Sequence, residues 1–184
     1  MTHPLDRRAW LAGTAGLAAV TAAKADDPPG KPAPKFKYSL NTSTVRRDGR
    51  SRPMGELVDV AAKAWYDGIE PWIAELDAYV KNGGSLKDIK KLIADLGLVV
   101  PSAIGFAVWV SDDADARKKG LEQAKRDMDT VAQIGGTKLA APPVGATDNA
   151  GLNLHAAADR YKTLLELGQK MGITPQVEVW GHSK

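Results

Sequence analysis

Apolar residues along the chain follow two spacings, one typical of buried strands and one typical of amphipathic helices. Short apolar runs recur at 36–41, 66–70, 98–106, 138–141 and 176–180. The segments between them carry apolar residues three and four positions apart, which is the spacing of a helix with one buried face. This alternation favours right-handed crossovers between strands and predicts an α/β fold with a five-stranded parallel sheet.

Start and stop residues delimit four helices within this pattern. Serine and asparagine accept hydrogen bonds from the first backbone N–H groups of a helix, and glycine ends a helix readily because it adopts a positive φ. Acidic residues in a first turn interact favourably with the helix dipole. The four predicted helices run from Pro53 to Ala64, from Ser85 to Gly97, from Asp112 to Gly135 and from Asn153 to Gly172.

Two architectures accommodate this pattern: a doubly wound sheet, and part of a (β/α)8 TIM barrel. A doubly wound nucleotide-binding sheet carries a glycine-rich turn after its first strand, and segment 42–47 contains no glycine. Polar and aromatic residues collect instead at the carboxyl ends of the predicted strands, which share one face in a barrel. We therefore predict a TIM barrel, truncated here to about five strands and four helices, because complete barrels need about 250 residues. These strand-end residues are Asn41, Glu70, Trp72, Trp109, Glu178 and His182.

Composition narrows the chemistry without identifying it. The chain has no cysteine, so a bound metal ion would need carboxylate and imidazole ligands. Its formal charge of +3 falls close to zero once the basic N-terminal segment described next is removed, so nucleic acid is not expected as a partner. No apolar run reaches the roughly 18 residues of a membrane-spanning helix, and no stable membrane anchor is expected.

Residues 1–25 have the pattern of an export signal. Arg7-Arg8 precedes a short stretch rich in alanine, glycine, leucine and valine, and Ala23-Lys24-Ala25 fits a small-x-small cleavage site. The paired arginines resemble a twin-arginine (Tat) signal, although an aspartate precedes them where serine or threonine is usual. We expect export to the periplasm, a flexible spacer at 26–35 and a folded domain over 36–184. An uncleaved amphipathic N-terminus is the alternative.

Glu178 is the strongest single candidate for a functional residue. It lies inside the apolar run 176–180, where an unpaired carboxylate costs several kcal/mol of desolvation unless a cation or hydrogen bonds receive it. A metal ligand or an acid/base at the end of a parallel strand meets this requirement. A carboxylate that faces solvent from an edge strand meets it as well.

Four segments resemble, in order and spacing, the xylose isomerase-like TIM barrels, the sugar phosphate isomerase/epimerase group. They are 66–72, 97–104, 135–142 and 177–180, and the similarity extends from about Lys37 to the end of the chain. The resemblance implies a barrel that holds one divalent cation, commonly Mn²⁺, Mg²⁺, Co²⁺ or Zn²⁺. Glu178 matches the metal-binding glutamate of strand five, which in related ketose 3-epimerases is also an acid/base near the reacting sugar carbon. The three remaining ligands are expected beyond Lys184.

Two further features bear on which substrate is expected, and the first departs from the epimerase pattern. Relatives often carry a second acidic residue six positions after the strand-five glutamate, where this chain has Lys184. The arginine-rich segment 46–52 is interpreted as a solvated loop in preference to a phosphate site.

The other strand-end residues are candidates for substrate binding. Glu70 and Asn41 suit hydrogen bonds to substrate hydroxyls, and His182 suits a position facing substrate. Trp72 and Trp109 suit contact between aromatic rings and sugar C–H groups. Each has a structural alternative: a salt bridge for the glutamate, core packing for the tryptophans and a solvated loop for the histidine.

The expected function is a metal-dependent sugar or cyclitol isomerase or epimerase that moves a proton next to a carbonyl, with a sugar or polyol as its small-molecule partner. Five strands alone leave two unpaired sheet edges, which predicts an inactive, poorly stable fragment or association into a homo-oligomer. A non-catalytic carbohydrate-binding barrel is the main alternative. An endonuclease IV-like hydrolase is disfavoured, because the strand ends at 70–72 and 106–109 lack the histidines of that zinc cluster.

Overall fold

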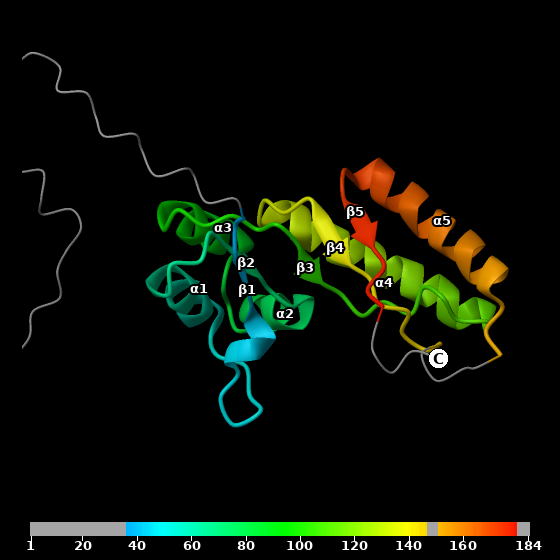
Figure 1. The fold of residues 1–184 in the computed structure, drawn as a ribbon, viewed down its shortest axis with the longest axis horizontal. Helices are drawn as coiled ribbons and strands as arrows, with labels where there is room; N and C mark the ends of the chain where they lie inside the picture. The colour runs from blue at the N-terminus through cyan, green and yellow to red at the C-terminus, as the bar shows by residue number, and fades with distance from the viewer. Residues whose placement is uncertain (1–35, 147–150, 180–184) are drawn as a thin grey trace, which may run out of the picture. The chain divides into compact units, whose positions relative to one another are not determined.

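Strands and helices alternate along the chain, as the sequence pattern predicts (Figure 1). The computed structural model describes residues 36–146 and 151–179, so the predicted export signal and spacer lie outside the described residues. The elements are β1 (Ser39–Asn41), the 3₁₀ helix η2 (Thr42–Val45), α1 (Met54–Lys63), β2 (Gly68–Glu70), α2 (Ile73–Lys81), α3 (Leu86–Asp95), β3 (Ala103–Ile104), α4 (Ala114–Gln133), β4 (Lys138–Ala140), α5 (Leu154–Met171) and β5 (Thr174–Gln176).

The order of the strands distinguishes a barrel from a doubly wound sheet. β1 pairs with β2, and β3, β4 and β5 pair in that order, all in parallel. Parallel bridges from Gly68 to Val99 and from Trp72 to Ile104 connect β2 with the segment of β3. Each strand therefore neighbours the next strand in the sequence, which is the order of a TIM barrel, whereas a doubly wound sheet reverses its order beside the first strand. β1 and β5 both run downward in Figure 1, and their carboxyl ends lie on the same side.

Proline shortens the third predicted strand. The sequence predicts one strand over 98–106, but β3 contains only Ala103 and Ile104, and Val99 joins β2 through a separate bridge. Pro101 lies between these two contacts, and it has no N–H group to donate to a ladder.

Proline also limits the fifth strand, and the prediction of a buried strand over 176–180 is wrong. β5 ends at Gln176, whose carbonyl accepts the last ladder hydrogen bond from the N–H of Ala141 at 2.7 Å. Pro142 and Pro143 follow on the β4 side and offer no further donors. Glu178 therefore lies two residues beyond the strand rather than inside it.

The predicted helix signals are confirmed, but one helix is missed. Ser85 accepts a hydrogen bond from the N–H of Asp88, and Asn153 accepts one from the N–H of His155. Gly172 ends α5 with a φ of +69°, as the glycine signal predicts. The described residues contain five α-helices rather than four, because α2 and α3 both connect β2 to β3. The apolar residues Ile73 and Leu76 of α2 are three positions apart, and this helical spacing is the signal for the missed helix.

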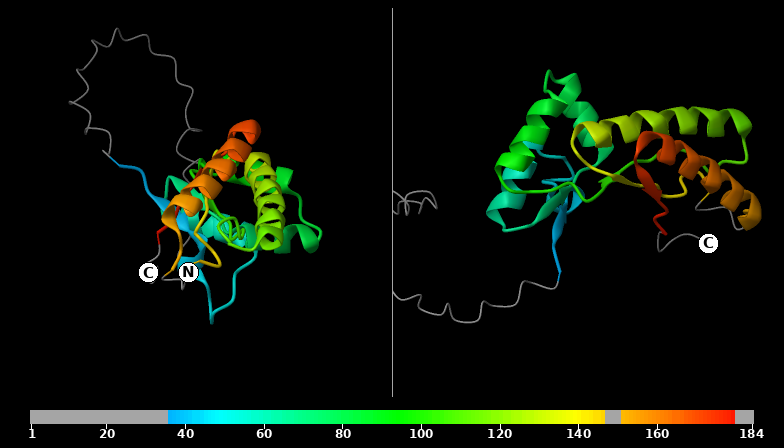
Figure 2. Two further views of the ribbon diagram at one scale, coloured as in Figure 1. Left: turned by 90° about the vertical axis from the view of Figure 1, so that its right-hand side faces the viewer. Right: turned by 90° about the horizontal axis from the view of Figure 1, so that it is seen from above.

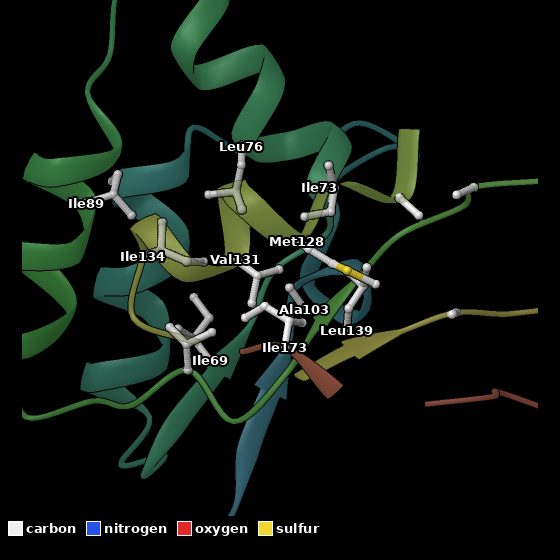
Figure 3. Packing of buried hydrophobic residues seen from close by; sticks show 14 of the residues in the cluster. Ile69, Ile73, Leu76, Ile89, Ala103, Met128, Val131, Ile134, Leu139 and Ile173 are labelled. Atoms are coloured by element: carbon white, nitrogen blue, oxygen red, sulfur yellow. The ribbon is translucent and has the colours of Figure 1, made fainter. Parts of the chain in front are cut away.

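The core lies between the strands and the helices that pack on them (Figure 3). Ile69 of β2 and Leu139 of β4 are at most 2% exposed, and so are Met128 and Val131 of α4. α4 also contacts α5, and the two helices run side by side in Figure 2. Among the described residues, no helix is both long and apolar enough to cross a membrane.

Candidate functional site

Three predicted site residues meet where β1 and β2 end. Asn41 is the last residue of β1 and stands opposite Glu70, the last residue of β2, in the parallel register. The side-chain N–H of Asn41 donates to Glu70 Oε2 at 3.0 Å, and Nε1 of Trp72 donates to Oδ1 of Asn41 at 3.2 Å. All three side chains are half-buried. The barrel register therefore brings an amide, a carboxylate and an indole together at the carboxyl ends of the strands.

Asn41 also fixes the start of the following loop. Its Oδ1 accepts hydrogen bonds from the backbone N–H of Ser43 at 3.0 Å and from Oγ of Ser43 at 2.7 Å. An asparagine at this position is a typical helix N-cap, and here it caps η2. The same oxygen thus orients both the loop and the Trp72 ring, so Asn41 has a structural role whether or not it contacts substrate.

The Trp72 ring is covered by two neighbouring side chains. The guanidinium carbon of Arg46 lies 4.1 Å from the ring centroid, which is a cation–π contact. The Phe106 ring lies 4.7 Å away between centroids, at an interplanar angle of 45°. In this structure the indole packs against protein groups rather than presenting an open face, and a contact between Trp72 and a sugar stays a prediction.

Glu75 is a buried carboxylate that is absent from the predicted site residues. Its side chain is 5% exposed and accepts hydrogen bonds from Thr42 Oγ1, from Ser51 Oγ at 2.7 Å and from the backbone N–H of Trp72 at 3.3 Å. Arg46 completes the set at 3.5 Å. Glu75 thereby ties the loop after β1 to the start of α2. The sequence carries one signal for this role. Glu75 lies three residues after Trp72, which precedes α2, and a glutamate at this position is half of a capping box.

Trp109 lies apart from this group. It is 3% exposed, its Nε1 donates to the carbonyls of Ala141 and Pro142 at 3.3 and 3.0 Å, and its ring lies 5.6 Å from that of Tyr161. These contacts hold the loop after β4 in place. They correspond to core packing, which is the structural alternative to substrate contact given for Trp109 above.

Glu178 is half-buried and, within the described residues, forms no hydrogen bond or ion pair. His182, the other predicted residue at this strand end, lies outside the described residues. In the part of the chain that the structure describes, no group of three histidine, cysteine, aspartate or glutamate side chains is placed to hold a metal ion. A carboxylate is an oxygen donor of the kind that divalent cations bind, so Glu178 suits one position in a metal site.

A groove on the helical side of the molecule has no connection to these residues. It lies between α4 and α5, has a volume of about 460 Å³ and is lined largely by long side chains such as Arg117, Lys125 and Glu166. Its lining includes neither the β1–β2 group nor Glu178. The chemistry of the strand ends is therefore the better candidate for function.

Comparison with known proteins identifies the family. The family model for the xylose isomerase-like TIM barrel matches residues 58–183, which is more than half of the chain. The chain belongs to the xylose isomerase-like TIM barrel family. This confirms the predicted family and, together with the consecutive strand order, the predicted barrel fold. No curated protein gives a significant match.

Solved structures of this fold resemble the chain at low sequence identity. A D-psicose 3-epimerase determined in the presence of D-fructose has a TM-score of 0.66 and 18% identity, over 81% of this chain and 54% of that one. The 3-keto-D-glucoside 4-epimerase of E. coli has a TM-score of 0.61 and 18% identity, over 81% and 58%. An IolI protein with a bound zinc atom has a TM-score of 0.63 and 17% identity, over 77% and 51%. The chain thus spans only about half the length of these structures.

Proposed function

We propose that this barrel belongs to a metal-dependent isomerase or epimerase of sugars or cyclitols. The observation that carries the proposal is the cluster of Asn41, Glu70 and Trp72 at the carboxyl ends of adjacent barrel strands, which is the face where TIM barrels place their active sites. Two of the similar structures are sugar epimerases, and a third is described with a bound zinc atom. The reactions of these similar proteins support an isomerase or epimerase class for this chain. They do not specify which sugar it binds.

Each residue of the cluster has a definite chemical role in this proposal. Glu70 accepts hydrogen bonds from substrate hydroxyls, and the amide of Asn41 keeps that carboxylate oriented at 3.0 Å. Trp72 holds the Asn41 side chain in place through the hydrogen bond from its Nε1, while its ring packs against Arg46 and Phe106. Because the groups are fixed by one another, little side-chain freedom is lost when a polyol binds.

Glu178 supplies one oxygen ligand to a divalent cation and moves a proton at the carbon next to the substrate carbonyl. Its carboxylate is half-buried just past the carboxyl end of β5, on the face where the barrel strands end. When bound, the cation would polarise the carbonyl and the adjacent hydroxyl. The remaining ligands are proposed to lie outside the described residues.

Exchange of a substrate proton with solvent tests this function. D-fructose and D-psicose are incubated in D₂O with Mn²⁺ and either this chain or a version extended to the length of a complete barrel, and deuterium at the carbons beside the carbonyl is followed by NMR. We expect exchange by the extended protein and a loss of at least about 100-fold in Glu178→Gln, because a positioned acid/base contributes 10²- to 10⁴-fold.

Two controls make the outcome decisive. Glu166→Gln, at an exposed position of α5, should leave exchange unchanged. Metal content by mass spectrometry should fall in Glu178→Gln and not in Glu166→Gln. Retention of metal and exchange by Glu178→Gln would contradict the proposal and would favour a non-catalytic carbohydrate-binding barrel.

A further inference from the structure

The loop between β1 and α1 contains a tight hairpin with an arginine on each side. The N–H of Arg47 donates to the carbonyl of Arg50 at 3.0 Å, and the N–H of Arg50 donates to the carbonyl of Arg47 at 2.9 Å. Between them, Asp48 and Gly49 have φ values of +52° and +72°. Positive φ at both central residues is typical of a type I′ turn, for which Asp-Gly is a preferred sequence. The loop extends beyond η2 in Figure 1.

This hairpin places two like charges opposite each other. Residues that exchange both backbone hydrogen bonds have neighbouring side chains, and like charges in such a pair destabilise it. Arg47 and Arg50 are exposed, and within the described residues neither side chain forms an ion pair. The two nearby arginines do form ion pairs: Arg46 with Glu75 and Arg52 with Glu56. Positive charge is therefore concentrated at the hairpin, with Asp48 as the one acidic residue of the segment 46–52.

The hairpin adjoins the strand-end cluster. Arg46 immediately precedes it, and the guanidinium of Arg46 lies over the Trp72 ring at 4.1 Å while its side chain remains 31% exposed. Trp72 is bonded in turn to Asn41, at the end of β1. A ligand seated at Asn41 and Glu70 would thus lie near the guanidinium of Arg46, and the hairpin with Arg47 and Arg50 begins at the next residue of the chain.

We propose that Arg46, Arg47 and Arg50 bind an oxyanion, a carboxylate or a phosphate, carried by the substrate. Arginine presents a planar set of N–H donors that matches the oxygens of both groups, and an anion between Arg47 and Arg50 relieves their repulsion. The identity of the ligand as a sugar rests on the proposed function, whereas the anion site rests on the hairpin itself. The segment then selects acidic sugars over neutral ones, in place of the solvated loop that the sequence predicts.

Calorimetric titration with matched ligands tests the site. The full 184-residue chain is titrated at low salt with D-glucuronate and D-glucose, and with D-fructose 6-phosphate and D-fructose. We expect at least one acidic sugar to bind about ten-fold or more tightly than its neutral partner, because hydrogen bonds between guanidinium groups and an anionic oxygen are stronger than those to a neutral hydroxyl. The acidic sugar with the larger preference over its neutral partner identifies the oxyanion as carboxylate or phosphate.

Variants of the hairpin make the test specific. The double variant Arg47→Gln, Arg50→Gln should lose most of the preference for the acidic sugar and keep its affinity for the neutral one. Asp48→Asn should strengthen the preference roughly three-fold, because asparagine retains the turn and removes a nearby negative charge. The matched control, Lys118→Gln with Lys119→Gln, removes the same charge from exposed positions on α4 and should change nothing.

The result also separates this inference from the proposed function. An unchanged preference in the arginine variant, an equal loss in the lysine control, or binding of neither acidic sugar would overturn the anion site. Glu178→Gln should keep the preference, because that residue takes no part in it. A protein that exchanges no substrate proton yet shows arginine-dependent selection of acidic sugars would contradict the proposed enzyme alone.

Discussion

Asp127 is a buried carboxyl group on α4 that the proposed chemistry does not use. It is 2% exposed, and its Oδ1 accepts a hydrogen bond from Gln123 at 2.5 Å. Burial raises the pKa of Asp127 to about 6; Asp77 on α2 adds to the rise, while the hydrogen bond from Gln123 and the charge of Arg126 oppose it. The group therefore changes charge within the pH range in which the protein would be studied.

The raised pKa gives stability a definite dependence on pH. An aspartate in the unfolded chain titrates near 3.9, so the folded state holds its proton to a higher pH than the unfolded state. The protonated Asp127 side chain therefore stabilises the folded state below about pH 4. This stabilisation is lost as the pH rises through about 6, and the free energy of unfolding falls by about 3 kcal/mol. Asp127→Asn should therefore unfold at higher urea concentration than the wild type at pH 7.5 and at the same concentration at pH 4.

A second aspartate provides the control for that experiment. Asp129→Asn, two residues along α4 at an exposed position, should shift the midpoint little at either pH. A gain in Asp127→Asn of equal size at both pH values would show that the effect is packing rather than ionisation.

At the scale of the elements, α4 lies so close to the segment after β3 that one helix position must be glycine. A Cβ atom on Gly120 would lie 2.1 Å from the carbonyl oxygen of Val108. The neighbouring atom belongs to the backbone and cannot rotate away. By contrast, a Cβ on Gly55 in α1 would meet only Leu92, at 4.0 Å.

These two glycines predict opposite results for the same substitution. Gly55→Ala should raise the free energy of unfolding by a few tenths to about 1 kcal/mol, because alanine favours the helix and has room. Gly120→Ala should lower it by about 1–3 kcal/mol, because the backbone must move to admit the methyl group. Urea unfolding followed by circular dichroism measures both. A stabilised Gly120→Ala would mean that α4 and the segment after β3 are further apart than described.

At the scale of the whole molecule, the described strands leave two open edges. β1 pairs only with β2, and β5 only with β4, among the described residues. Past β5, Val177 is 43% exposed and Val179 is 81% exposed. Unpaired strand edges with exposed apolar side chains favour pairing with another chain.

Self-association is the measurable consequence. Sedimentation velocity should show oligomers of this chain that increase with concentration, and the double variant Val177→Lys, Val179→Lys should shift the distribution toward monomer, because charges at an edge oppose pairing. Val80→Lys, at a position on α2 that is 45% exposed, is the matched control. A monomeric wild type at all concentrations would contradict this prediction.

The candidate site shows which features a sequence reveals and which it hides. Asn41, Glu70 and Trp72 are predictable because each ends a strand, and parallel register brings such positions together. Glu75 is not predicted, since its four partners come from η2, from the loop that follows η2 and from the residue before α2, and only the fold brings them to one carboxylate. The predicted roles of Glu178 and His182 depend on residues outside the described chain.

The sequence by itself determines the alternation of strands and helices, the helix ends and the family, because each is encoded within a few neighbouring residues or in an ordered set of short motifs. The export signal stays a prediction of that kind. Tertiary structure alone decides the consecutive strand order, the short β3 and β5, and the covering of the Trp72 ring by Arg46 and Phe106. The physical reason is that these features depend on which backbone groups find partners across the fold, and local spacing does not specify those partners.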